Sequence, residues 1–154
     1  MSKTYISQAM RTEAEAYFHR RCAYCQSPQA LMNVTFEVDH IIPEKEGGQT
    51  LSVNLAFACP LCNGHKGAQR WGYDPFSTLT VSLFHPRKQI WSRHFRWSAD
   101  QQTIEGRPRS GRATVEVLRL NNLNLMRLRN IWIAIGSAPP DWQTPPLIGL
   151  SAVH

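Results

Sequence analysis

The sequence predicts an α+β fold, with a small strand–loop–strand–helix core followed by a half in which short strands precede helices. Two Cys-x2-Cys pairs enclose a β-branched run at 34–38 that alternates apolar and polar residues. Later in the chain, helical spacing replaces strand spacing over 113–120 and 123–135. With 154 residues, 42% of them hydrophobic, the chain is long enough to bury one ordinary core.

The N-terminal segment is predicted to contain a short helix. Thr12 and Glu15 have the Ser/Thr-x-x-Glu spacing of a capping box, so this helix should begin there and end near residue 20. The run at 34–38 then predicts a strand that ends at Asp39 and His40.

A loop, a second strand and a helix complete the predicted core. Pro43 and the glycine pair at 47–48 should force the loop. The mostly apolar run at 51–58 predicts the returning strand. Residues 63–70 follow the last cysteine and predict a short helix that its two glycines weaken.

The second half of the chain changes character near residue 77. We predict a core at 1–76 and an accessory half at 77–154 packed on it, or a single domain over 1–140 with an irregular tail. The elements predicted in this half are strands at 79–84, 91–97 and 102–104, helices at 113–120 and 123–135, and a tail with proline pairs at 139–140 and 145–146.

All four cysteines of the chain belong to the two pairs. Each Cys-x2-Cys pair places two thiolates on one tight turn, and two such turns complete the four-thiolate shell of a structural zinc site. Two disulfides, or buried thiols without a metal, are the alternatives. Disulfides need an oxidising compartment, and the N-terminus has no apolar core of signal-peptide length. The sequence therefore predicts a structural Zn²⁺ held by Cys22, Cys25, Cys59 and Cys62.

The charge balance favours a polyanionic partner. Lys and Arg number 17 against 11 Asp and Glu, which gives a net charge of +6 and agrees with binding to nucleic acid. The longest apolar stretch, at 131–135, is too short to cross a bilayer. We expect a cytoplasmic protein with no membrane association and no small-molecule cofactor; the composition indicates no particular oligomeric state.

Three polar residues inside the cysteine frame could carry out chemistry. Asp39 and His40 are adjacent at a strand end, where alternation directs neighbouring side chains to opposite sides. Asn63 directly follows a cysteine. Carboxylate and amide oxygens suit Mg²⁺ or Mn²⁺, and an imidazole of near-neutral pKa suits a general base. This set fits phosphodiester hydrolysis, in which a metal stabilises the phosphorane and a base activates water.

These residues, in this order, resemble the HNH nucleases of the ββα-metal (His-Me finger) group. The resemblance covers about residues 22–70 and implies a metal-dependent endonuclease that cuts DNA and leaves 5′-phosphate and 3′-hydroxyl ends. It rests on the two cysteine pairs, Asp39-His40-Ile41-Ile42-Pro43, Gly47-Gly48, Asn54-Leu55, and Asn63 with Lys66.

The resemblance implies a role for each matching position. His40 matches the general base, and Asp39 and Asn63 match the two ligands of the catalytic divalent metal. Asn54 matches the residue whose side chain fastens the loop and helps to orient the histidine. The four cysteines match the structural zinc of the tetracysteine branch. The third position of the motif, often His, is Asn63 here, which makes this chain an HNN variant.

Other polar residues near this motif have open interpretations. His65 could be a metal ligand, a phosphate contact or a bystander, and Lys66 could contact phosphate or lie on a solvated helix face. Glu37 has no matching role and is expected to be a surface residue. The segment 85–97 interleaves cations with aromatics; we favour a core position for its aromatic rings over a DNA-contacting one and leave its arginines open.

The sequence thus predicts a metal-dependent HNH endonuclease acting on DNA. One alternative is a non-catalytic, zinc-stabilised module that binds nucleic acid. The other is a subunit of a larger defence or mobile-element system that is active only with a partner. Asp39 and Asn63 discriminate against the first alternative, because a pure binding module has no use for hard ligands beside its zinc.

Overall fold

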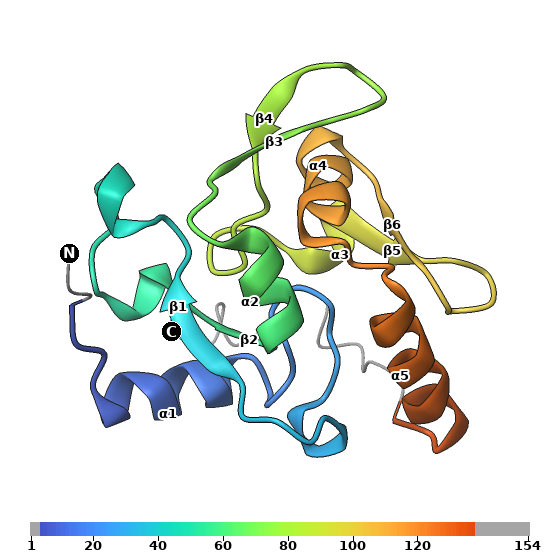
Figure 1. Ribbon diagram of the computed structural model, residues 1–154, viewed down its shortest axis with the longest axis horizontal. Helices are drawn as coiled ribbons and strands as arrows, with labels where there is room; N and C mark the ends of the chain where they lie inside the picture. The colour runs from blue at the N-terminus through green and yellow to red at the C-terminus, as the bar shows by residue number, and fades with distance from the viewer. Residues whose placement is uncertain (1–3, 138–154) are drawn as a thin grey trace, which may run out of the picture.

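The computed structural model describes residues 4–137 (Figure 1). It confirms an α+β fold, with five α-helices and three two-stranded antiparallel sheets in the described part of the chain. The proline pairs expected in an irregular tail lie outside the described residues. Within 4–137, no helix is both long and apolar enough to cross a membrane.

The first helix, α1 (Gln8–Tyr17), begins before the predicted capping box. Ser7 is the N-cap, and its Oγ accepts a hydrogen bond of 3.1 Å from the backbone N–H of Met10. Thr12 therefore lies inside the helix and not at its start. The expected start was wrong because the cap at Ser7 comes first along the chain.

The predicted strand–loop–strand–helix core is present. Strand β1 (Glu37–His40) pairs antiparallel with β2 (Leu55–Ala58), and α2 (Pro60–Lys66) follows. β1 begins later than the run at 34–38 suggested, because the N–H of Phe36 donates to the side chain of Gln29 and not to a partner strand. Figure 1 shows α2 lying between this hairpin and the second half of the molecule.

Helix α2 begins three residues earlier than predicted. Cys59 is its N-cap, and its Sγ accepts a hydrogen bond of 3.4 Å from the N–H of Cys62. Pro60 occupies the first helical turn, where its fixed φ favours a helix start and its missing N–H costs nothing. The helix ends at Lys66, before Gly67 with φ +52.

The segment after α2 contains a strand that the sequence analysis missed. β3 (Trp71–Tyr73) pairs antiparallel with β4 (Thr80–Ser82), so the predicted division at 76/77 falls in the turn of this hairpin. The segment predicted as a strand at 91–97 is half helical, because it begins with a short helix. The remaining elements are α3 (Trp91–His94), β5 (Phe95–Trp97), β6 (Ile104–Gly106), α4 (Arg109–Leu118) and α5 (Leu123–Ala134).

Hydrogen bonds and an ion pair join the residues after the β3–β4 hairpin to the first half of the chain. The indole N–H of Trp91 donates to the carbonyl of Tyr24 at 2.8 Å. Arg87 donates from Nε to the carbonyl of Leu55 at 2.9 Å and pairs with Glu13. Trp91 and Phe95 are almost fully buried, so the core position favoured for the aromatic rings of 85–97 is confirmed.

Candidate metal centre and catalytic site

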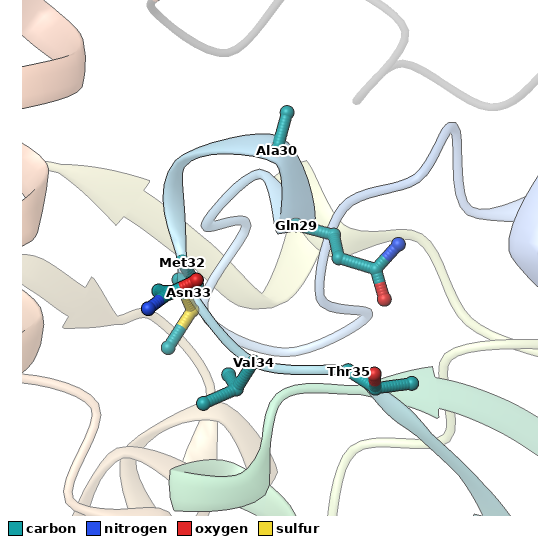
Figure 2. Close-up of a pocket in the computed structure, with 6 residues that line it drawn as sticks. All are labelled: Gln29, Ala30, Met32, Asn33, Val34 and Thr35. Carbon is teal, nitrogen blue, oxygen red and sulfur yellow. The ribbon is translucent and has the colours of Figure 1, made fainter.

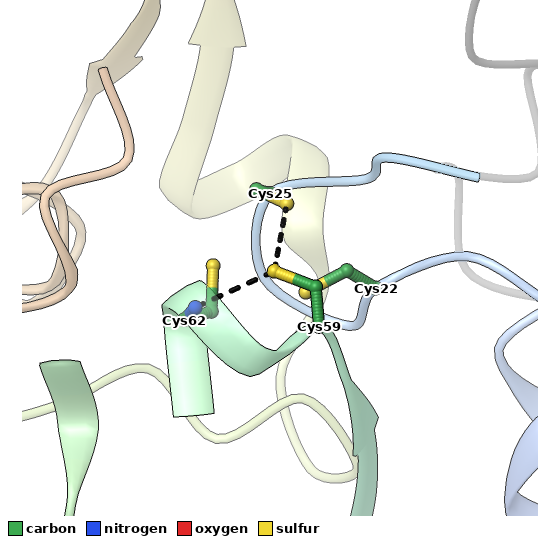
Figure 3. Close-up of side chains that lie close together, drawn as sticks. All are labelled: Cys22, Cys25, Cys59 and Cys62. Carbon is green, nitrogen blue, oxygen red and sulfur yellow. Dashed lines mark hydrogen bonds between the residues drawn. The ribbon is translucent and has the colours of Figure 1, made fainter. Parts of the chain in front are cut away.

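The four cysteines converge in the interior of the molecule (Figure 3). All are buried, and their sulfur atoms lie within 4.8 Å of one another. The Sγ atoms of Cys25 and Cys59 are 3.8 Å apart, too far for a disulfide. A tetrahedral zinc with Zn–S bonds of about 2.3 Å places its sulfurs about 3.8 Å apart. The cluster could therefore hold a structural zinc, as the cysteine spacing predicted.

Electrostatics around these thiols favour a bound cation. The neighbouring thiols, followed by burial, raise the pKa values of Cys59 and Cys62, because a thiolate there has no compensating charge. A bound divalent cation reverses this balance and deprotonates coordinating thiols. Burial also acts to raise the pKa of Cys25, but hydrogen bonds from the other three cysteines outweigh it, and the pKa of Cys25 lies well below its ordinary value.

Two buried arginines, Arg21 and Arg129, lie near the cysteine cluster. Burial lowers the pKa of each guanidinium, and the charge of the Cys25 thiolate opposes that shift in both. Arg129 is completely buried and donates to the carbonyl of Leu120 at 2.9 Å and to Oδ1 of Asn121 at 3.2 Å. A zinc ion with four thiolates carries two net negative charges, which these two cations would offset.

Alternation along strand β1 places the predicted metal ligand Asp39 and the predicted base His40 on opposite faces of the strand. Glu37 and Asp39 lie on one face and are exposed and partly exposed, whereas Val38 and His40 are buried on the other. Helix α2 brings Asn63 to the first of these faces, where its Nδ2 donates to Oε1 of Glu37. Three oxygen-bearing side chains therefore belong to one face of the hairpin.

His40 is held between a hydroxyl and a carboxylate. Its Nε2 is 2.8 Å from Oγ1 of Thr50, and its Nδ1 is 3.8 Å from Oδ1 of Asp39. A hydrogen bond from Nε2–H to Thr50 leaves Nδ1 with a free lone pair, on the side of Asp39. In the tautomer with its hydrogen on Nε2, the basic nitrogen of the ring is Nδ1, on the side of the predicted metal ligand.

Asn54 fastens the loop that carries Thr50. Its Oδ1 accepts from the N–H of Ile42 at 2.8 Å, and its Nδ2 donates to the carbonyls of Ile42 at 3.1 Å and Gln49 at 2.9 Å. Gly48 is needed in this loop, because a Cβ there would lie 1.7 Å from the carbonyl oxygen of Ile42. This is the geometry expected of a residue that fastens the loop.

Comparison with known proteins agrees with this geometry. The model of the family described as HNH endonuclease matches residues 22–69, a segment that spans both cysteine pairs, β1, β2 and α2. Residues 22–69 are an HNH endonuclease domain. The domain indicates a nuclease-type function for the segment that contains the site.

A curated relative matches beyond the HNH domain. The chain is 30% identical over 125 residues to the Septu protein PtuB of Bacillus thuringiensis, an alignment that covers 79% of this chain. The same alignment covers 43% of PtuB, so the chain spans less than half the length of that relative. No solved structure matches the chain.

Lys66 of the HNH motif and the neighbouring His65 have internal partners in the structure. Lys66 is only 3% exposed, and its Nζ donates to the carbonyl of His40 at 3.4 Å. Burial lowers the pKa of Lys66, and the charge of Asp39 opposes the shift. His65 directs Nδ1 to the carbonyl of Leu118 on α4, at 3.0 Å. Lys66 therefore joins α2 to the end of β1, and His65 joins α2 to the second half.

Sequence analysis missed two residues that contact the site. Glu37 was expected to be a surface residue, and it is exposed, but its carboxylate binds Asn63. Its position two residues before Asp39 on a strand was the available signal. Thr50 offered no signal, because its partner His40 is ten residues away across an irregular loop.

The described surface also has a shallow pocket that is separate from these residues (Figure 2). Its volume is about 440 Å³, and it lies on the loop between the first cysteine pair and β1. None of the residues discussed above for the HNH site lines it. Its lining consists of Gln29, Ala30, Met32, Asn33, Val34 and Thr35.

Proposed function

We propose that the HNH domain hydrolyses phosphodiester bonds of DNA, with His40 as the general base and Asp39 and Asn63 holding a divalent metal. One observation carries the proposal: the two nitrogens of His40 are differentiated. Nε2 is engaged by Thr50, and Nδ1 lies 3.8 Å from the Asp39 carboxylate. A hydrogen bond at one nitrogen is common for a buried imidazole. What supports a general base is the second nitrogen, which lies beside a predicted metal ligand.

The donor set fits a hard cation. Asp39 offers a carboxylate, Asn63 an amide oxygen, and both are partly accessible on the same face of the hairpin. Oxygen donors of this kind are typical of Mg²⁺ and Mn²⁺ sites. When bound, the cation would stabilise the negative charge that develops on the phosphate and its leaving oxygen.

The residues of this chain prepare the attack on the phosphate. His40 accepts a proton from water at Nδ1, and Thr50 holds the opposite nitrogen so that the ring cannot turn its basic atom away. Asn54 holds the loop in which Thr50 lies. The charge of +6 favours association with a polyanionic substrate.

The test is cleavage of plasmid DNA by the purified, zinc-loaded protein with Mg²⁺ or Mn²⁺. His40→Ala should lower the cleavage rate by about 10²-fold or more, because general-base catalysis contributes that much. Zinc content and melting temperature should stay close to those of the wild type. His19→Ala, which changes an exposed histidine on the turn after α1, is the matched control and should cleave normally.

Three results would separate this proposal from its alternatives. Cleavage by His40→Ala at the wild-type rate would remove His40 as the base. A wild-type protein that binds Mn²⁺ through Asp39 but does not cleave would favour a nuclease that needs a partner. A protein that binds nucleic acid but neither binds Mn²⁺ nor cleaves would favour a non-catalytic zinc module.

A further inference from the structure

The β3–β4 hairpin presents an aromatic face that the catalytic site does not use. Trp71 and Tyr73 are adjacent on one side of β3, and their residues are 50% and 54% exposed. Their cross-strand partners are Ser82 and Thr80, so the same face also carries hydroxyl groups. We call Arg70, Trp71 and Tyr73, with these two partners, the outer face of the hairpin.

Packing on α4 fixes which face of the hairpin points outward. Gly72 lies between the two aromatic residues on the opposite side, and a Cβ there would be 2.7 Å from Val117 and 2.8 Å from Leu83. Val81, its cross-strand partner, packs against the core. The aromatic rings are therefore directed to solvent because the inner side has no room for them. Figure 1 shows the hairpin projecting beyond α2 and α4.

The turn of the hairpin is held by a partly buried ion pair. Asp74 is fully buried and accepts two hydrogen bonds from Arg112 on α4, at 2.9 and 3.0 Å. The N–H groups of Phe76 and Ser77 also donate to its carboxylate. These contacts hold the backbone of the turn, so the hairpin that carries the outer face is anchored to α4.

The charge of the outer face complements a polyanion. The guanidinium of Arg70 lies over the Trp71 ring, 5.3 Å from its centroid. Asp74 is the only acidic residue between 67 and 82, and Arg112 neutralises it. The outer face therefore combines a cation, two ring faces and hydroxyl groups with no uncompensated negative charge, as surfaces that bind nucleic-acid strands do.

The outer face is close to the catalytic residues along the chain. Lys66, the last residue of α2, contacts the carbonyl of His40, and Trp71 follows five residues later. Five residues span at most about 18 Å between Cα atoms.

From these observations we propose that the outer face of the β3–β4 hairpin binds unpaired nucleotides of the substrate, with Trp71 and Tyr73 stacked on bases and Arg70 on the phosphate backbone. The proposal rests on the proposed function for the nature of the substrate and adds a preference for DNA with an unpaired segment near the cleaved bond. In a duplex the base faces are already covered, so exposed rings gain little from it.

Binding is measured by fluorescence anisotropy of labelled oligonucleotides, in the zinc-loaded His40→Ala protein and without Mg²⁺ or Mn²⁺, so that cleavage plays no part. The probes are single-stranded DNA, duplex DNA and a duplex with a single-stranded tail. Trp71→Ala and Tyr73→Ala should each weaken binding to unpaired DNA roughly 5-fold or more, and duplex binding much less. Arg70→Ala should reduce the slope of log affinity against log salt by about 0.7 for single strands.

Matched variants separate surface contacts from loss of fold. Tyr5→Ala and Arg127→Ala change an exposed aromatic and an exposed cation elsewhere, and both should bind like the parent. Trp71→Phe keeps a ring and should recover most of the affinity lost in Trp71→Ala. Melting temperatures of all variants should agree with that of the parent within a few degrees.

Unchanged single-strand affinity in Trp71→Ala and Tyr73→Ala would overturn the proposal, and so would an equal loss for duplex and unpaired DNA. Failure of every probe to bind would also overturn the proposal and would indicate that the outer face binds a protein partner instead. Normal binding by the outer face together with a wild type that does not cleave would support this inference and contradict the proposed nuclease activity. The two proposals can therefore fail separately.

Discussion

At the scale of single residues, Glu37 determines which atom of Asn63 is available to a cation. An asparagine amide presents an oxygen and an NH₂ group, and only the oxygen can bind a metal. Because Nδ2 donates to Oε1 of Glu37, the oxygen is directed away from that carboxylate. Glu37 is thus a positioning residue in the proposed site.

Glu37→Ala should weaken Mn²⁺ binding about 10-fold, as loss of an outer partner of a metal ligand commonly does. Glu37→Gln keeps an oxygen that can accept from Asn63 and should restore part of the affinity, which a purely charge-based role would not allow. Isothermal titration with Mn²⁺ measures both variants. Glu46→Ala is the control, an exposed glutamate on the neighbouring loop. Equal Mn²⁺ affinity in Glu37→Ala and the wild type would contradict this role.

The motif residues could be predicted from the sequence because each has a distinctive neighbour. Asp39 and His40 are marked by their position at a strand end, and Asn63 by the cysteine before it. Glu37 and Thr50 could not be assigned in the same way, because their partners are fixed by the packing of α2 and by the course of the loop. Contacts that depend on tertiary structure leave no local pattern.

At the scale of elements, boundaries were predicted less well than element types. Helix α2 was expected over 63–70, but it spans Pro60–Lys66. Its first turn was missed because a cysteine is an unusual N-cap, and its end was placed too late because the helix stops at Gly67. Strand β3 was missed because it is three residues long and contains Gly72, which disfavours a strand by propensity. The structure explains that glycine by its contact with α4.

Removal of zinc should unfold the core, because Cys59 is the N-cap of α2 and one of the four cysteines that could hold the metal. Structural zinc contributes about 10–16 kcal/mol to the folding of small zinc modules. Cys59→Ala should lose zinc and its cooperative thermal transition in circular dichroism. A zinc-selective chelator should do the same to the wild type, reversibly on adding zinc. A zinc-free protein with an unchanged melting temperature would contradict this prediction.

The turn that begins at His85 should make stability depend on pH. The N–H groups of Arg87 and Lys88 donate to Nδ1 of His85, at 3.3 and 3.2 Å, which requires an unprotonated ring. Burial, followed by the charge of Lys88, lowers the pKa of His85 to about 4. The unfolded chain, with a histidine pKa of about 6.5, therefore takes up a proton at higher pH than the folded one.

The free energy of unfolding should therefore fall as the pH is lowered from about 6.5 toward 4. Above pH 6.5, where His85 is unprotonated, its contribution to stability should be fully present. Because the ring is partly exposed, we expect a loss on the order of 1 kcal/mol. Urea unfolding at neutral and acidic pH, in wild type and His85→Asn, measures it. The difference between the two proteins cancels the titration of the cysteines, and equal pH dependence in both would rule out His85 as the source.

At the scale of the whole molecule, the second half contacts the segment that carries the first cysteine pair. Trp91 donates to the carbonyl of Tyr24, between the cysteines of the first pair. Arg21, next to Cys22, donates to Ser137 beyond the end of α5. The division at 76/77 therefore separates residues that pack around one site, and we propose that the described halves fold as a single unit.

Arg129 tests whether the two halves form one unit, because it lies on α5, far along the chain from every cysteine. If its charge offsets the two negative charges of a zinc-thiolate cluster, Arg129→Met should lower zinc affinity about 10-fold while preserving the apolar packing of the side chain. Arg127→Met, an exposed arginine on the same helix, should leave zinc affinity unchanged. Zinc transfer to a competing chromogenic chelator measures both variants. Equal zinc affinity in the two variants would contradict this role of Arg129. A loss confined to Arg129→Met would support a zinc site that is completed by a side chain from the second half of the chain.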